Sequence, residues 1–129
     1  MGAAALAGIG ARPAPTSIAA GKSGRPPDPM MPARNLGRTG YSVGIFSLGG
    51  QAAVEQPDNT DAAVSLIERA LDLGVNYIDT SARYGGDMRW SERYIGQVMK
   101  RRRAETFLAS KTHDRTRDGS LRLLERSFE

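Results

Sequence analysis

Cysteine is absent from the 129-residue sequence, and histidine occurs once, at His113. The lack of cysteine excludes disulfide bonds, thiolate nucleophiles and cysteine-based zinc sites, and one histidine is too few for a histidine-rich metal centre. No apolar run approaches the roughly 20 residues that a membrane-spanning helix needs. We therefore expect neither a metal site nor a membrane segment.

A large excess of one charge is also absent. The sequence has 18 Lys and Arg residues and 14 Asp and Glu residues, which gives a formal net charge of +4. This excess is small and spread along the chain, so it does not predict a nucleic-acid partner. Residues 100–103 (KRRR) form the densest basic cluster, but no aromatic residue is interleaved with them for base stacking. Such a cluster is typical of the solvated end of a helix.

The first 33 residues differ in composition from the rest. Ala, Pro and Gly supply 20 of these 33 residues, and no aromatic residue occurs before Tyr41. Such a segment buries too little apolar surface to offset the entropy lost on ordering, so we expect a disordered leader over residues 1–33. Its opening resembles the apolar part of a signal peptide, although no Lys or Arg precedes Arg12. Two alternatives remain: a remnant of an export signal, or an upstream extension of a cytoplasmic protein that begins at Met30 or Met31.

From Arg34 onward, apolar residues recur with the periods of strands and helices. The pattern predicts a hairpin over residues 35–43, strands over 45–48, 75–79 and 106–110, and helices that begin at Asp58 or Thr60, at Ser91, and at Asp118 or Ser120. Each helix has an apolar face, formed by Ala63, Ile67, Ala70 and Leu71, by Ile95, Val98 and Met99, and by Leu121, Leu124 and Phe128. We expect the first strand to be buried.

The predicted strands begin about 30 residues apart, which is the size of one strand-helix unit. Strand and helix alternate, so we expect an α/β fold with a parallel sheet. An eight-unit barrel needs about 250 residues, far more than this chain has. The third helix pattern also reaches Glu129 without a stop signal. We therefore expect the chain to be the front part of a longer one.

Three residues that can handle protons follow the ends of neighbouring predicted strands. Asp79 ends the second strand, Tyr84 lies in the loop after it, and Lys111 follows the third strand. Because the carboxyl ends of parallel strands meet at one rim, we expect the three side chains to lie together. A free phenol has a pKa of about 10, too high for efficient proton exchange near neutrality, and a nearby cation favours the phenolate. The same residues also suit a turn cap, a loop and a solvated strand end, so spacing alone leaves both interpretations open.

Several motifs, taken together and in order, resemble the N-terminal part of the aldo-keto reductases. They are residues 36–40 (LGRTG), 47–50 (SLGG), 70–80 (ALDLGVNYIDT), Tyr84-Gly85 with Ser91-Glu92, Ile95-Gly96 and 108–111 (LASK). The resemblance covers about residues 34–129 and implies the N-terminal portion of a (β/α)8 TIM barrel, with the hairpin closing the bottom. It also implies reduction of a small aldehyde or ketone by hydride transfer from NADPH, with NADH as an alternative.

The resemblance assigns roles to individual residues. Tyr84 is expected to be the general acid for the carbonyl oxygen, Lys111 to ease the release of its proton, and Asp79 to pair with Lys111. Cofactor contacts are expected at Gly50 and Gln51, after the first strand, and at Asp79. The oligomeric state is left open.

His113 and Trp90 lie close to the three residues in the sequence and are further candidates for the substrate pocket. His113 does not match the family's catalytic histidine, which follows the fourth strand, and we expect it at the rim, where it can line the substrate. Trp90 is either a wall of the substrate pocket or a packed loop aromatic. A non-catalytic, nicotinamide-binding regulatory or interaction protein of the same fold is the alternative function. Because three strands of an eight-strand barrel leave unpaired edges, we expect the 129 residues alone to be loosely folded and inactive.

Overall fold

The computed structural model describes residues 31–129, so the leader predicted over residues 1–33 lies outside the described residues apart from its last three. Ala33 already belongs to the first strand. The strands are β1 (Ala33–Asn35), β2 (Ser42–Gly44), β3 (Leu48–Gly49), β4 (Tyr77–Asp79) and β5 (Phe107–Ala109). The helices are α1 (Thr60–Asp72), α2 (Trp90–Arg102) and α3 (Arg117–Glu125), and short 3-10 turns form η1 (Ala52–Val54), η2 (Gly86–Met88) and η3 (Arg103–Glu105).

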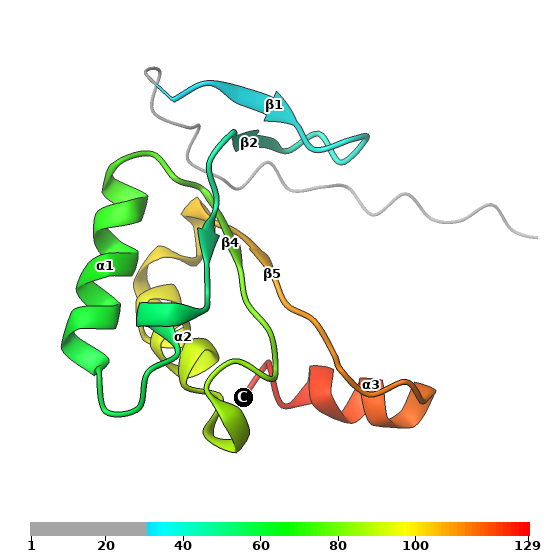
Figure 1. Cartoon of the computed structure of the whole chain (residues 1–129). Helices are drawn as coiled ribbons and strands as arrows, with labels where there is room; N and C mark the ends of the chain where they lie inside the picture. The colour runs from blue at the N-terminus through cyan, green and yellow to red at the C-terminus, as the bar shows by residue number, and fades with distance from the viewer. Residues whose placement is uncertain (1–30) are drawn as a thin grey trace, which may run out of the picture.

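β1 and β2 form the predicted antiparallel hairpin, which lies at the amino ends of the other strands (Figure 1). The buried Asn76 side chain joins this hairpin to the rest of the molecule. Its Oδ1 accepts from the Gly44 N–H at 2.9 Å, and its Nδ2 donates to the Ser42 carbonyl at 2.9 Å. Because its amide oxygen and nitrogen both have partners, this polar side chain can be buried beneath the hairpin without a large penalty.

β3, β4 and β5 form the predicted parallel sheet, in that order. The register places Leu48, Ile78 and Leu108 in one row, and Gly49, Asp79 and Ala109 in the next. Side chains alternate between the two sides of a sheet, so the two rows face opposite ways. The first row packs into the core under α1 and α2, which lie on the same side of the strands (Figure 1). We call this side the covered face and the other side the open face.

The core lies between the covered face and the two helices. Its buried members are Val54, Ala63, Ile67, Leu71, Ile78, Tyr94, Ile95, Val98 and Met99. The Tyr94 hydroxyl accepts from the Asn59 N–H and donates to the Gln56 carbonyl, each at 3.0 Å. Fully burying one large aliphatic side chain contributes roughly 1.5–3 kcal/mol. The apolar faces predicted for α1 and α2 therefore provide the main hydrophobic layer of the described residues.

The strand predicted over residues 45–48 is wrong in its first part. Strand pairing with β4 is limited to Leu48 and Gly49, whereas Ile45 and Phe46 are more than half exposed. The Ile45 N–H donates to the Pro32 carbonyl at 2.9 Å. This segment therefore continues the pairing of the hairpin and joins the parallel sheet only at Leu48.

The apolar face predicted for the third helix is exposed in the structure. Leu121, Leu124 and Phe128 are exposed, because no strand or helix among residues 31–129 covers them. The helix also begins earlier than predicted. Thr116 is its N-cap, and the Thr116 Oγ1 accepts from the Gly119 N–H at 3.1 Å.

The basic cluster at residues 100–103 is not simply solvated. Arg101 pairs with Glu68, and Arg102 pairs with Asp72 and Glu105 at 2.8 Å each. These contacts join the end of α2 to α1 and to η3, so part of the cluster has a structural role.

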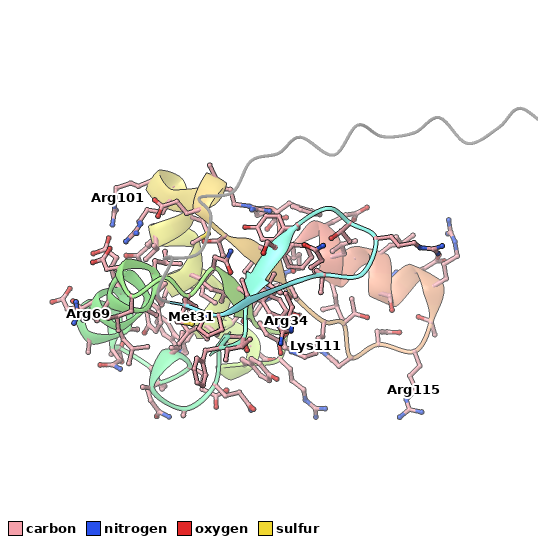
Figure 2. All side chains as sticks on the ribbon, turned by 90° about the horizontal axis from the view of Figure 1, so that it is seen from above. Met31, Arg34, Arg69, Arg101, Lys111 and Arg115 are labelled. Atoms are coloured by element: carbon pink, nitrogen blue, oxygen red, sulfur yellow. The ribbon has the colours of Figure 1, made fainter. Side chains whose placement is uncertain are left out.

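Other basic side chains are spread over the molecule, as Arg34, Arg69 and Arg115 show in Figure 2. This spread agrees with the diffuse charge expected from the composition. No helix of the described residues is long and apolar enough to cross a membrane, and no group of three potential metal-ligating side chains gathers within residues 31–129.

Candidate active site

The aligned ends of β4 and β5 bring Asp79 and Lys111 together. Asp79 is the last residue of β4 and belongs to the row on the open face, while Lys111 follows β5 by two residues. The Lys111 Nζ donates to the Asp79 Oδ1 and to the Thr80 carbonyl, at 2.8 Å in each case. The side chains of Lys111 and Asp79 are 46% and 38% exposed, so the pair remains accessible to a ligand.

Tyr84 completes the predicted group of three. The Lys111 Nζ lies over the Tyr84 ring, 4.9 Å from the ring centre. A tight turn after β4 places the phenol there, with the Tyr84 N–H donating to the Ser81 carbonyl at 3.1 Å. The structure thus brings together all three residues that the strand-end argument selected.

The surroundings of Lys111 change its acidity in opposing ways. Partial burial lowers the pKa of Lys111, but its hydrogen bonds to Asp79 and Tyr84 and its electrostatic attraction to them outweigh this effect, and the pKa lies above its ordinary value. An ammonium stabilised in this way stays charged well into the alkaline range. The rim therefore holds a fixed positive charge beside a phenol.

The backbone of the loop after β4 is tied to the strand ends on both sides. The Ala82 N–H donates to the Lys111 carbonyl at 3.2 Å, and the Thr80 N–H donates to the Ala109 carbonyl at 2.8 Å. These bonds extend the pairing of β4 and β5 past their last residues. The main chains that carry Tyr84 and Lys111 consequently form one connected unit.

Glu55 is a contributor that the sequence reasoning missed. Its Oε2 accepts from the Gly85 N–H at 3.2 Å, directly after Tyr84, and its Oε1 accepts from the Ala52 N–H at 3.2 Å. Gly85 has a φ of +82°, which favours glycine, and an added Cβ there would lie 2.6 Å from Trp90. The Tyr84-Gly85 pair could have suggested a constrained turn, but no sequence signal points to Glu55 as its partner.

Gly50 is buried behind the rim, at the end of β3. Its N–H donates to the Asp79 carbonyl at 2.7 Å, so this donor is already occupied. A Cβ at this position would lie 2.5 Å from the Ser91 Oγ and 2.8 Å from the Thr80 Oγ1, two hydroxyls that share a hydrogen bond of 2.7 Å. Gly50 therefore allows a close approach between β3, β4 and α2, and its contact with a cofactor stays a prediction.

Gln51 is exposed in the loop after β3, where its carbonyl accepts from the Val54 N–H at 3.2 Å. This position leaves its side chain available at the rim. Its contact with a cofactor also stays a prediction.

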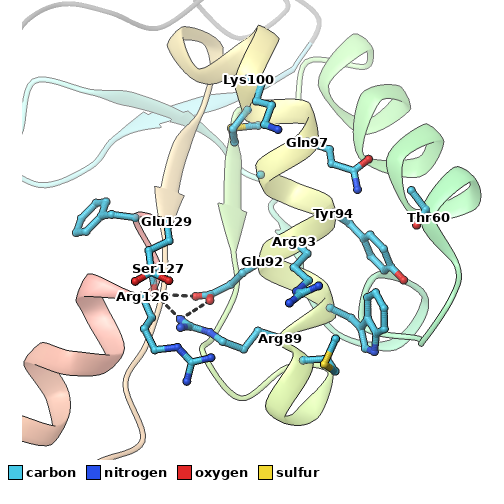
Figure 3. Close-up of a pocket in the computed structure, with 15 residues that line it drawn as sticks. Thr60, Arg89, Glu92, Arg93, Tyr94, Gln97, Lys100, Arg126, Ser127 and Glu129 are labelled. Carbon is cyan, nitrogen blue, oxygen red and sulfur yellow. Dashed lines mark hydrogen bonds and ion pairs between the residues drawn. The ribbon is translucent and has the colours of Figure 1, made fainter.

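Trp90 is a packed aromatic, which agrees with the second of its two interpretations. Its ring stacks on Tyr94 with the ring centres 5.6 Å apart, and the Arg93 guanidinium lies 5.7 Å from its centre. Trp90 also borders an open cavity of about 750 Å³ along the outer side of α2 (Figure 3). His113 is exposed and is not bonded to the Asp79–Lys111 pair, but it lines a second cavity beside the loop after β4.

A buried ion pair next to the site was also missed. Arg89 precedes α2 and pairs with Glu92, and the Glu92 Oε1 accepts from the Ser110 Oγ at 2.7 Å and the Ser127 Oγ at 3.1 Å (Figure 3). Ser110 is the neighbour of Lys111 in the chain. An acid in the first turn of α2 is visible in the sequence, but its partners are 18 and 35 residues away.

The comparisons with known proteins agree with this geometry. The sequence model of the Aldo/keto reductase family matches residues 42–129. The chain is 31% identical over 90 residues to the uncharacterised oxidoreductase YqkF of Bacillus subtilis, an alignment that covers 70% of this chain and 28% of YqkF. It is 38% identical over 69 residues to L-galactose dehydrogenase of Arabidopsis thaliana, covering 52% of this chain and 21% of that enzyme.

Solved structures give the same result. The thermostable aldo-keto reductase Tm1743, crystallised with the inhibitor epalrestat, superposes with a TM-score of 0.65 at 31% identity. The match covers 76% of this chain and 38% of Tm1743, so the described strands and helices correspond to part of a (β/α) barrel. The chain spans about a quarter of the length of the curated relatives it matches. On the family match, the identities and the superposition, this chain belongs to the aldo/keto reductase family.

Proposed function

We propose that this site takes part in the reduction of an aldehyde or ketone, with Tyr84 as the general acid for the carbonyl oxygen. The observation that carries the proposal is the position of the Lys111 ammonium, 2.8 Å from the Asp79 carboxylate and 4.9 Å from the centre of the Tyr84 ring. A fixed cation favours the negative charge that develops on a phenol as it gives up its proton. Family membership supports the reaction class.

Each of the three residues has its own task in this proposal. Tyr84 moves a proton to the carbonyl oxygen, and Lys111 stabilises the phenolate that is left. Asp79 and the Thr80 carbonyl hold the ammonium in position. When bound, a reduced nicotinamide would supply the hydride for the carbonyl carbon, so that with the proton from Tyr84 the carbonyl gains two electrons and two protons in all.

The open face has room for the nicotinamide. Gly49 has no side chain, and no atom of residues 31–129 outside its immediate neighbours lies within 4 Å of the position that a Cβ would take. Asp79 lies beside it in the same row. A flat ring can therefore approach the strand ends next to Tyr84. NADPH is the proposed cofactor, with NADH as the alternative, and Gly50, Gln51 and Asp79 are its proposed contacts at this edge.

The decisive test is Tyr84→Phe in the enzyme that contains these residues. We expect turnover of an aldehyde, measured through the oxidation of NADPH, to fall by about 10²–10⁴-fold, which is the usual contribution of a general acid. Cofactor affinity, measured by quenching of protein fluorescence, should stay within twofold. Parental turnover by the phenylalanine variant would remove Tyr84 from the role of acid.

The same titration separates the alternative function. Cofactor binding that is never followed by oxidation, whatever the carbonyl compound, would favour a regulatory protein of this fold. The intact Lys111–Asp79 pair beside Tyr84 supports catalysis. We also propose that residues 1–129 by themselves do not turn over substrate, since they correspond to 38% of the Tm1743 chain. Steady-state turnover by the 129-residue polypeptide would contradict this.

A further inference from the structure

A cavity of about 590 Å³ lies between the loop after β4 and α3, outside the group formed by Asp79, Tyr84 and Lys111. Three arginine side chains contribute to its wall. The charged or titratable residues that line it are Arg83, Arg89, Arg126, His113 and Asp87. Three guanidinium groups therefore face one carboxylate. Such a wall concentrates positive potential in a small, partly enclosed space.

Arg89 is the buried member of this wall, with 6% of its surface exposed. Its NH2 nitrogen is fully engaged, since it pairs with Glu92 and donates to the Leu123 carbonyl at 3.3 Å and to the Ser127 Oγ at 2.5 Å. The Nε and NH1 nitrogens, in contrast, have no hydrogen-bond partner among the described residues. Leaving the buried donors of a charged group unpaired destabilises the folded state. We therefore expect these two nitrogens to bind an acceptor.

The backbone of Arg89 is unusual as well. Its φ is +54°, in the left-handed region that a side chain of this kind rarely adopts. Backbone conformations of this kind persist where the surrounding structure enforces them, and they gather at ligand sites. In Figure 3 the Arg89 side chain reaches from the residue before α2 toward Ser127 and Arg126.

Arg126 brings a second guanidinium to the same place. It lines this cavity together with Arg89, and Glu92 is the carboxylate bound to Arg89. Glu92 neutralises one of these two cations, and Asp87, which also lines the cavity, offsets a second. Arg83 adds a third positive charge from the loop that carries Tyr84. An anion with several oxygens matches this arrangement, because arginine donors pair well with the oxygens of phosphate and carboxylate groups.

We propose that this cavity binds a small oxyanion, a phosphate or carboxylate group, on Arg83, Arg89 and Arg126. The apolar residues of the lining are Ala82 and Leu123, and it holds no Phe, Tyr or Trp ring for base stacking. The anion is either free or the charged end of the carbonyl substrate. The second source is reasonable because Arg83 directly precedes Tyr84, and His113 follows Lys111 by two residues. Binding of the anion itself does not depend on the proposed reduction.

The test is calorimetric titration of the full chain with inorganic phosphate, with chloride used to hold the ionic strength constant. We expect saturable binding. Arg126→Gln and Arg83→Gln should each weaken it by about tenfold or more, the effect of losing one hydrogen bond from a charged group. Arg117→Gln is the matched control, because it removes the same charge from α3 at an exposed residue that does not line the cavity. It should leave the affinity within twofold.

Arg89 needs a second readout, because Arg89→Met can also loosen α3. The Arg126 and Arg83 variants leave the buried ion pair intact, so the proposal is decided by them. A short aldehyde that carries a phosphate group distinguishes the two sources: tighter binding than inorganic phosphate indicates the end of a substrate, and equal binding indicates a free anion. The absence of saturable phosphate binding, or equal losses in Arg126→Gln and Arg117→Gln, would overturn the proposal.

Discussion

The covered and open faces of the parallel sheet place different functions on neighbouring residues of one strand. Ile78 of β4 is fully buried against α1 and α2, whereas the next residue, Asp79, faces the other way and binds the partly exposed Lys111. The pleat of a strand sends successive side chains to opposite faces, so one step along the chain leads from the core to the candidate site. Stability is concentrated on the covered face, and reactive groups are concentrated on the open face and its rim.

The largest expected effect comes from opening the covered face. Ile67→Ala in α1 should lower the free energy of unfolding by about 3–4 kcal/mol, because it leaves a cavity in a fully buried site. Leu121→Ala in α3 should change it by less than about 0.5 kcal/mol, because Leu121 is exposed. Urea denaturation of the two variants measures both values. Equal losses would show that α3 is as well packed as α1.

A polar change should loosen α3 selectively. Glu92→Gln removes the charge paired with the buried Arg89 and weakens the bonds to Ser110 and Ser127, at an expected cost of about 2 kcal/mol. Hydrogen exchange should quicken at the amides of α3, with those of α1 much less affected. Glu125→Gln, at an exposed acid of α3, is the control and should leave both rates unchanged. Uniform acceleration across the two helices would contradict a local effect.

Substitutions at Gly49 and Gly50, at the end of β3, compare the stability of the open and covered faces at a single strand. Gly50→Ala forces a Cβ against the hydroxyls of Thr80 and Ser91 and should cost about 1–2 kcal/mol. Gly49→Ala points into open space and should stay within about 0.5 kcal/mol. Thermal unfolding midpoints report the difference. A larger fall in the unfolding midpoint for Gly49→Ala than for Gly50→Ala would contradict the prediction.

The smallest expected effect is on the open face, where the Lys111–Asp79 pair is partly exposed. The chain has three lysines, Lys22, Lys100 and Lys111, so their side-chain carbon resonances can be followed with pH. The pKa of Lys111 is raised in the folded state, and Asp79→Asn should lower it.

The sign of the accompanying stability change follows from that shift. A lysine whose pKa is raised on folding stabilises the folded state below its unfolded pKa, and this contribution disappears as the pH rises through the folded pKa. The difference in unfolding free energy between the parent and Asp79→Asn should therefore vanish in strong alkali. Its size should stay below about 1 kcal/mol, because solvent screens the pair. A difference that grows with pH would contradict the assignment.

The candidate site was predictable where it depends on the direction of the strands. Asp79, Tyr84 and Lys111 follow the ends of two strands, and the rule that parallel strands end at one rim was enough to place them together. Glu55, which holds the Gly85 N–H from 30 residues away, was not predictable, because nothing local in either segment indicates the other. The partners of Arg89 were missed for the same reason.

The amino-acid sequence by itself determined the order of the strands and helices, their approximate limits, the parallel sheet and the identity of the three residues at its rim. Periodicity and turn residues act over a few positions, and they carry that information locally. Tertiary structure decided which apolar faces are covered, since Ile67 and Leu121 both lie on apolar helix faces but only Ile67 has neighbours on all sides. It also decided that Gly50 must lack a side chain and that two Arg89 nitrogens have no partner within residues 31–129, because both depend on atoms from distant parts of the chain.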